Sequence, residues 1–176
     1  VGGFSGTVSR ATVTVFSYGS SRPNDTDMAL RGPNGQTVML LSDACGTGGM
    51  QNNNLTFDDA AATFVSSVAC ANYTEGSFKP SNYGDPANDS FPSGPTAPYL
   101  NTLATFNGAP ANGDWSLFMF DDEAGFFGFE ISGWALTLEV PSATGQRAAA
   151  LKKCKKKKKT AKARKKCRNK ANKLPV

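Results

Sequence analysis

Histidine is absent from the 176 residues of this chain. Because histidine is the usual general base near neutral pH and the commonest metal ligand, the chain alone cannot build a Ser-His-Asp or Cys-His catalytic site or a histidine-bound zinc site. Apolar runs of 18 or more residues are also absent, so the sequence predicts no transmembrane segment. The chain starts at Val1 with no Met and no apolar targeting segment, which predicts a soluble fragment or a processed product.

Acidic residues are absent from the C-terminal part of the chain. Residues 147–176 hold 15 of the 19 Lys and Arg and no Asp or Glu. Residues 1–146 hold four basic and 14 acidic side chains, a formal charge of −10. This asymmetry predicts two parts, an acidic body over 1–146 and a basic tail over 147–176, whose binding properties must be considered separately.

Apolar residues of the body alternate at the period of β-strands. Val13 and Val15 share one face of a predicted strand, and the Trp115 and Trp134 segments alternate in the same way. Asn34-Gly35 between two apolar runs predicts a hairpin, because both residues tolerate positive φ. Short strands and Gly-rich turns predict an all-β fold, an antiparallel jelly-roll-like β-sandwich.

A long segment, Ala71 to Thr102, interrupts this pattern with Asn, Ser, Gly and five of the ten prolines. Loops of this length in compact domains are usually functional or poorly ordered. The segment is therefore interpreted either as a solvated excursion over the sandwich surface or as a binding surface.

Three sequence blocks of the body are weak motifs when taken singly, but the three together, in this order, are specific. They are Asp27-Met28-Ala29-Leu30-Arg31-Gly32-Pro33-Asn34-Gly35-Gln36-Thr37, then Phe106-Asn107-Gly108 with Asn112-Gly113-Asp114-Trp115-Ser116-Leu117, and finally Asp121-Asp122, Gly125, Gly128 and Ser132-Gly133-Trp134-Ala135-Leu136-Thr137-Leu138. From about Thr12 to Val140 the body resembles a P/Homo B domain, the β-sandwich that follows the catalytic domain of subtilisin-like proprotein convertases.

The resemblance implies a non-catalytic module that packs on a serine endopeptidase domain and stabilises it. Both tryptophans are expected in the core of the sandwich. The chain departs from the family at Gly125-Phe126-Phe127-Gly128-Phe129, where Gly-Asp-x-Gly is common. Phe126, Phe127 and Phe129 are candidate contacts for a partner domain. The alternative is that they fold back and cap the sandwich.

Oxygen donors gather near Asp25, Asp27, Asp121 and Asp122. Calcium takes six to eight oxygen ligands, which loops at one end of a sandwich can supply, so these four are candidate calcium ligands. The alternative is a set of solvated turn carboxylates. No other cofactor is expected. A glycosidase is disfavoured because Asp121 and Asp122, adjacent on a strand, point to opposite faces.

The four cysteines predict an oxidising compartment and hence a secreted or cell-surface protein. A disulfide between Cys45 and Cys70 would stabilise the body by about 3 kcal/mol. Cys154 and Cys167 are 13 residues apart, about 19.5 Å along one straight helix, against a limit of about 7 Å for bonded cysteines. Either the tail folds back near Thr160 or these thiols pair elsewhere.

The basic tail is expected to be partly helical at most, since like charges three and four residues apart repel. Its density of cations predicts binding to a polyanion, with an anionic surface polymer favoured and a merely solvated end as the alternative. Sequence-specific nucleic-acid binding has no support, because the tail has no aromatic residue for base stacking. The candidate polyanion-binding residues are Lys152, Lys153, Lys155, Lys156, Lys157, Lys158, Lys159, Lys165, Lys166 and Arg168.

The leading functional hypothesis is a non-catalytic accessory domain in a parent chain that also holds a subtilisin-like catalytic domain. The second is a stand-alone adhesion or glycan-binding module, with the 71–102 segment as its contact surface and the tail tethering it to an anionic envelope. The third, a DNA-condensing protein, depends on the tail alone.

Overall fold

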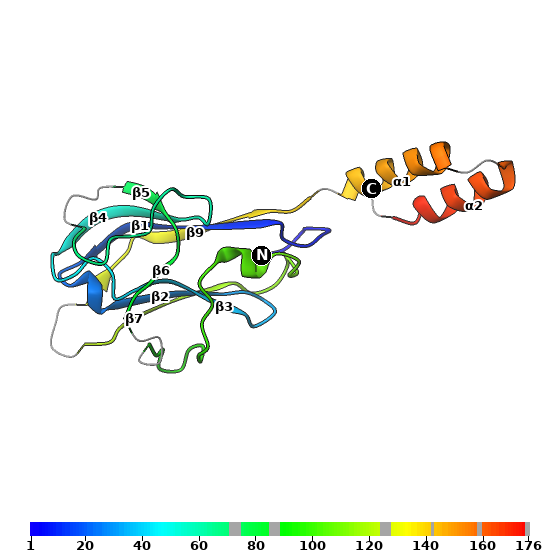
Figure 1. Ribbon diagram of the computed structural model, residues 1–176. Helices are drawn as coiled ribbons and strands as arrows, with labels where there is room; N and C mark the ends of the chain where they lie inside the picture. The colour runs from blue at the N-terminus through cyan, green and yellow to red at the C-terminus, as the bar shows by residue number, and fades with distance from the viewer. Residues whose placement is uncertain (71–74, 85–88, 124–127, 142, 158–159, 175–176) are drawn as a thin grey trace.

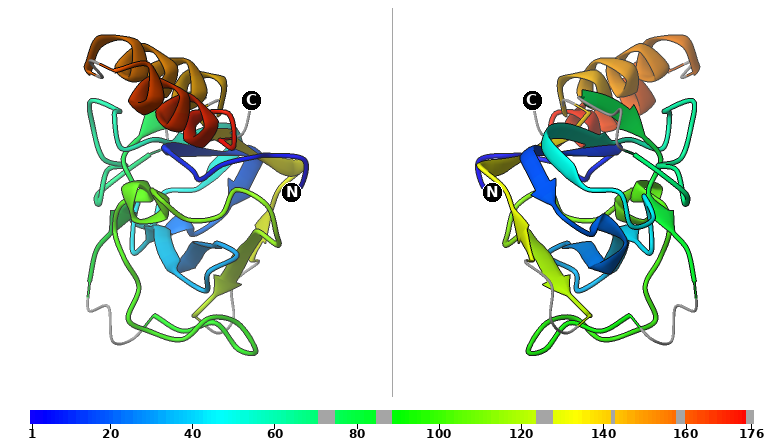
Figure 2. Two further views of the ribbon diagram at one scale, coloured as in Figure 1. Left: turned by 90° about the vertical axis from the view of Figure 1, so that its right-hand side faces the viewer. Right: turned by 90° about the vertical axis from the view of Figure 1, so that its left-hand side faces the viewer.

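The body of the molecule is built from β-strands, and the C-terminal part is a pair of α-helices (Figure 1). The computed structural model describes residues 1–70, 75–84, 89–123, 128–141, 143–157 and 160–174. Two sheets face each other across a shared apolar core, as two views at right angles to the first also show (Figure 2). The predicted all-β class of the body is therefore confirmed.

Each sheet has a simple strand order. The first sheet runs β5-β4-β1-β8, with β9 also paired to β1, and the second runs β6-β3-β2-β7. The strands are β1 (Arg10–Ser20), β2 (Thr26–Arg31), β3 (Thr37–Ser42), β4 (Met50–Phe57), β5 (Glu75–Phe78), β6 (Ser81–Asn82), β7 (Ser116–Asp121), β8 (Phe129–Glu130) and β9 (Gly133–Glu139). The remaining elements are the short 3₁₀ helices η1 (Pro23–Asp25) and η2 (Leu103–Phe106) and the helices α1 (Ala143–Lys157) and α2 (Ala161–Ala171).

Both sheets are mixed, so the prediction of a purely antiparallel sandwich is wrong. Strand β5 pairs with β4 in parallel, and β6 pairs with β3 in parallel. A long connection separates each strand from its parallel partner, and connections of that length can return the chain in the same direction. The other pairings, those of β1 with β4, β8 and β9 and of β2 with β3 and β7, are antiparallel.

The hairpin predicted around Asn34-Gly35 is present as β2 and β3. Gly35 has φ of 82° and its N–H donates to the Gly32 carbonyl, which is the left-handed turn geometry that glycine favours. One irregularity interrupts the pairing: Met28 lies opposite Leu41 but Ala29 lies opposite Met39, so Leu40 is an extra residue in β3. This bulge shifts the alternation of β3 by one residue.

The core lies between the sheets and contains Val13 and Val15, as the alternation predicts. Phe106 and Trp115 meet edge to face at 5.0 Å between ring centroids, and both are buried. The expectation that Trp134 is also a core residue is wrong, because its side chain is 36% exposed. Trp134 lies on β9, which in the described part of the chain pairs only with β1, and an edge strand covers its side chains on one side only.

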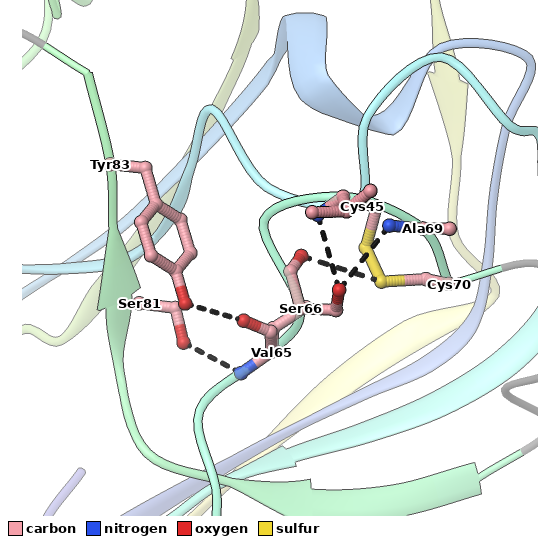
Figure 3. The surroundings of a disulfide bond; sticks show 8 residues. Cys45, Val65, Ser66, Ala69, Cys70, Ser81 and Tyr83 are labelled. Atoms are coloured by element: carbon pink, nitrogen blue, oxygen red, sulfur yellow. Dashed lines mark hydrogen bonds between the residues drawn. A yellow bond between two sulfur atoms is a disulfide. The ribbon is translucent and has the colours of Figure 1, made fainter.

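The predicted disulfide between Cys45 and Cys70 is present and buried (Figure 3). The two Cα atoms are 4.8 Å apart, and the backbone N–H of Cys45 donates to the Ser66 carbonyl at 2.6 Å. The Tyr83 hydroxyl donates to the Val65 carbonyl at 2.8 Å, which ties the same segment to the end of β6. The bond therefore closes a region that is already hydrogen-bonded into the second sheet.

The tail folds back on itself near Thr160, which was one of the two predicted alternatives. Cys154 in α1 is bonded to Cys167 in α2, with 5.6 Å between their Cα atoms. Thr160 caps α2, since its hydroxyl accepts a hydrogen bond from the Ala163 N–H at 3.3 Å. The tail is more helical than expected, because the disulfide holds two short helices side by side and each helix then needs less intrinsic stability.

Helix α1 begins at Ala143, inside the body that the charge pattern predicted to end at 146. In the described part of the chain, none of the helices combines the length and the apolar character needed to cross a membrane. The two disulfides indicate that the protein folds in an oxidising environment.

Candidate functional site

The four carboxylates predicted as calcium ligands come from two neighbouring strands. Asp25 closes η1 and Asp27 lies in β2, while Asp121 ends β7 and Asp122 follows it. Strand register places Thr26 opposite Asp121, and the Asp122 N–H donates to the Asp25 carbonyl at 3.0 Å. The fold therefore brings all four residues to the same end of the second sheet.

Strand alternation divides these carboxylates between the two faces of the sheet. Met28 and Leu30 face the core, so Asp27 lies on the outer face with Ala29. Asp121 lies on the core side, because it is opposite the inward-facing Thr26. The pKa of Tyr18 is raised to about 12, chiefly by burial of its hydroxyl and then by the charges of Asp121 and Asp25. The charge of Asp25 also acts on Asp43 and Asp122.

On the outer face, Ser42 is the centre of a second group of oxygen atoms. Because of the bulge at Leu40, Leu41 turns to the core and Ser42 lies on the outer face opposite Asp27. The register of the parallel pair places Asn82 of β6 beside Ser42. The Ser42 hydroxyl donates to Asp89 Oδ1 at 3.1 Å, so Asp89, from the long segment, completes the group.

Several oxygen atoms at this end of the sandwich are buried and have no hydrogen-bond partner. Asp27 Oδ2 and Asp89 Oδ2 are two of them, and these residues are only 1% and 5% exposed. Asn82 Oδ1 is buried and unpartnered on the same face, and Asp25 Oδ2 and Asp121 Oδ1 are buried and unpartnered at the same end of the sheet. Buried polar groups nearly always have a partner, so this concentration of unpartnered acceptors indicates that something that binds oxygen atoms belongs here.

The pKa values of the carboxylates around Ser42 also indicate that a cation would be bound favourably there. The pKa of Asp27 is raised to about 7, chiefly by burial and then by the charges of Asp89, Asp122 and Asp43, against a lowering by its hydrogen bond with Ser42. The pKa values of Asp43 and Asp122 are also raised, chiefly by burial and then by neighbouring carboxylates. A bound cation would relieve this repulsion.

The predicted ligand set is brought together only in part. In the described part of the chain, no three carboxylates or thiols already converge closely enough to hold a metal ion. Asp27 faces Ser42 on the outer face while Asp121 lies on the core side, so the four predicted residues do not share one centre.

Sequence reasoning missed Asp43, Asp89 and Asn82. The bulge in β3 and the return of the long segment over the sheet place them beside Asp27, and neither feature has a local signal. A partial signal existed for Asp43, which follows β3 directly and has φ of 51°, a conformation that Asp tolerates better than most residues.

The 71–102 segment supplies the edge strands β5 and β6, and its described residues from Asp89 onward pack on the outer face of the second sheet. The Phe91 ring meets Tyr99 and Phe118 edge to face, at 5.7 and 6.2 Å between centroids, and both Phe91 and Phe118 belong to a small apolar cluster on that face. This part is therefore a covering layer.

We compared the chain with known proteins. No family model, no curated protein and no solved structure matches it. The P/Homo B resemblance and every function derived from it therefore remain proposals.

Of the three predicted partner contacts, Phe126 and Phe127 lie outside the described residues. Phe129 is in β8, where it is half-buried and packs against the main core. This position agrees with the alternative that Phe129 caps the sandwich.

A different apolar surface lies along strands β7 and β9. Strands β5 and β6 are consecutive and joined by Lys79 and Pro80, so the opposite edges of the two sheets, β9 and β7, lie on the same side of the sandwich. The side chains that these two strands direct toward the core remain partly exposed there. We call this surface the apolar seam; its residues are Leu117, Met119, Trp134, Leu136 and Leu138.

The cations of the tail lie on the surface of the helical hairpin, apart from the sandwich (Figure 1). Six of the predicted polyanion-binding residues are exposed: Lys152, Lys153, Lys155, Lys165, Lys166 and Arg168. The side chains of Lys156, Lys157, Lys158 and Lys159 lie outside the described residues. Lys165 and Arg168, with Asn169 and Asn172, line a shallow groove along α2.

Proposed function

We propose that this chain is a non-catalytic accessory module of a secreted or cell-surface protein, with a P/Homo B-like sandwich of the jelly-roll type. The observation that carries the proposal is the apolar seam. Its exposed side chains, and the outer edges of β7 and β9, with which no further strand pairs among the described residues, offer a surface that a second domain can cover. In the resembled family the partner is a subtilisin-like serine protease domain, and such a domain in the same parent chain is the partner proposed here.

The first test is the native protein recovered from its own source. Its intact mass and the sequence preceding Val1 show what the sandwich is joined to. A preceding domain that supplies its own Asp, His and Ser supports the proposal. A parent chain that lacks any such domain overturns it.

The second test uses a matched pair of aromatic residues in that parent protein. Trp134 and Phe16 are exposed to 36% and 38%, and they lie on neighbouring strands of the first sheet. Trp134 belongs to the apolar seam, whereas Phe16 lies on the opposite face. Trp134→Ser should shorten the half-life of the protease during thermal inactivation, and Phe16→Ser should not. Equal effects of the two changes would show that the seam is not the contact.

The helical hairpin is proposed to tether the module to an anionic surface polymer. Its exposed cations release counterions when they bind a polyanion, so affinity should fall steeply with salt. Lys165→Gln with Lys166→Gln should weaken binding to an acidic polysaccharide and reduce the salt dependence. Arg31→Gln, an exposed cation of the body, is the matched control. Binding unchanged by the hairpin substitutions would overturn the tether.

The second candidate function is a stand-alone adhesion or glycan-binding module. The separation of the cationic hairpin from the sandwich favours it, because a tethered module needs its anchor away from its contact surface (Figure 1). It predicts saturable binding to a neutral polysaccharide that survives the hairpin substitutions. If the protein instead binds DNA with a steep salt dependence and does not bind polysaccharide, the result would support the DNA-condensing hypothesis.

A further inference from the structure

The carboxylates around Ser42 on the outer face of the second sheet have no role in the proposed accessory function. We call them the outer acidic group. It joins three parts of the chain on one face of the second sheet: Asp27 in β2, Asp43 after β3, and Asp89 in the long segment. Ser42 connects two of them, since it lies opposite Asp27 and donates to Asp89. An arrangement that draws ligands from distant segments is typical of calcium sites outside helix-loop-helix motifs.

Two of these carboxylates are enclosed and incompletely bonded. Asp27 and Asp89 are at least nine-tenths buried, and each has one carboxylate oxygen without a partner. The amide oxygen of Asn82, next to Ser42 in the register of β3 and β6, is also buried without a partner. Without a ligand, burial of charged oxygen atoms costs free energy that the fold does not otherwise recover.

A glycine keeps the position of the third carboxylate open. An added Cβ at Gly84 would overlap Asp43 Oδ2, so the Asp43 carboxylate lies directly over the Gly84 backbone. Gly84 also has φ of 72°, which other residues rarely adopt. The Tyr83 N–H donates to the Ser42 carbonyl, which holds this turn beside the group.

We propose that Asp27, Asp43 and Asp89, together with the amide oxygen of Asn82, form a calcium site that fastens the long segment to the outer face of the second sheet. The donors are carboxylate and amide oxygens, which calcium accepts in irregular geometry, whereas magnesium requires a near-ideal octahedron and retains water. The three carboxylates do not yet converge in this structure, so binding draws them together around the ion. Because Asp89 comes from the long segment, the ion joins that segment to β2 and β3.

This ligand set differs from the one that the sequence suggested. It retains Asp27, leaves out Asp25 and Asp121, and adds residues that only the strand register and the long segment bring near. Asp122 is exposed and acts on Asp27 through its charge. We assign it no bond to the ion.

The test is titration of the full chain with calcium chloride after removal of metal by a chelator. Calorimetry and thermal unfolding report binding, and mass spectrometry of protease fragments locates cleavage between Asp89 and Thr102. Calcium should raise the melting temperature and slow cleavage in this segment. No heat and no shift at millimolar calcium would overturn the site.

Four substitutions distinguish this ligand set from its alternatives. Asp27→Asn and Asp89→Asn should each weaken calcium affinity at least about tenfold. Asp121→Asn on the core side and Asp114→Asn, an exposed residue outside the group, should leave the affinity unchanged. If Asp121→Asn abolishes calcium binding while Asp89→Asn binds calcium with wild-type affinity, the proposed ligand set is overturned in favour of a site around Asp121.

The Asp-to-Asn variants also separate loss of a ligand from loss of the fold. In chelator, Asp27→Asn should melt no lower than the wild type, because it removes a repelled charge from a buried position. In calcium, the order should reverse, with the wild type melting higher. A variant that melts lower under both conditions would show a purely structural role and overturn the site. None of these outcomes depends on the partner domain proposed above.

Discussion

The sandwich and the helical hairpin each contain one disulfide, but the two bonds act on different kinds of structure. Cys45–Cys70 lies within a core of more than twenty buried side chains, among them Tyr18, Phe57 and Phe106. Cys154–Cys167 joins two helices whose described side chains are mostly cationic and exposed. A disulfide therefore supplements an apolar core in one region and substitutes for it in the other.

Removing the hairpin disulfide should have the largest effect. In Cys154→Ser with Cys167→Ser, α1 and α2 should lose their helical structure, because short helices with like charges on neighbouring turns are marginal alone. Far-UV circular dichroism measures the loss, and the melting temperature of the sandwich should not change. Helices that persist without the bond would show that packing between α1 and α2 is enough.

Truncating a core aromatic should have the next largest effect. Phe106→Ala removes a fully buried ring that contacts Trp115, and it should lower the free energy of unfolding by about 3–5 kcal/mol. Urea denaturation measures the change. The control is Phe16→Ala, whose ring is exposed and whose removal should cost about 0.5 kcal/mol or less. Similar costs for the two would contradict the assignment of the core.

Loss of the sandwich disulfide should follow. Cys45→Ser with Cys70→Ser opens a loop spanning a sequence separation of 25 residues and should cost about 3 kcal/mol in the chain-entropy model. Unlike the hairpin, the sandwich should remain folded, since its core and the hydrogen bonds around Val65 persist. Chemical denaturation monitored by tryptophan fluorescence would show this. An unfolded sandwich in the absence of denaturant would contradict the comparison.

The smallest expected effect, at most about 1.4 kcal/mol for each pH unit, is a pH dependence confined to the sandwich. The pKa of Asp27 is raised from 3.8 to about 7 in the folded state, so between these values the folded state binds more protons than the unfolded state. In chelator, the free energy of unfolding should therefore fall as the pH rises from about 4 to about 7. Asp43, Asp89 and Asp122 face the same group and contribute to its repulsion.

Asp27→Asn should flatten this dependence. The control, Asp114→Asn, should not alter it. Thermal melts across the pH range provide the measurement for the wild type and both variants, with hairpin helicity followed in parallel. A stability that rises with pH over this range would show that the carboxylates of the group have partners.

Local sequence signals predicted the local features of the fold. Asn34-Gly35 marked the β2–β3 hairpin, and the alternation around Val13 marked β1. The spacing of Cys154 and Cys167 limited the tail to two arrangements, one of which was the fold-back at Thr160. In each case, the physical constraint acts within a few turns of the chain.

Features that depend on strand order could not be predicted in this way. Strand β5 pairs in parallel with β4, and β6 pairs in parallel with β3. The partners are far apart in sequence, and no turn motif specifies either pairing. Trp134 alternates like a core residue, but its exposure is decided by the edge position of β9. The calcium ligands predicted from the sequence lie at the same end of the sandwich as the site proposed above, but the two sets share only Asp27, because the other proposed donors depend on register.

The extra residue Leu40 gives β3 a place where it can lose one residue without changing which side chains form the acidic group. Val38 and Leu40 face the core and Met39 faces outward, and the bulge makes Leu41 face the core as well, so that Ser42 faces outward. An in-frame deletion of the Leu40 codon would remove the bulge, place Leu41 in the inward position of Leu40 and leave Ser42 facing outward. A one-residue deletion in a strand without a bulge would instead turn every later side chain to the other face.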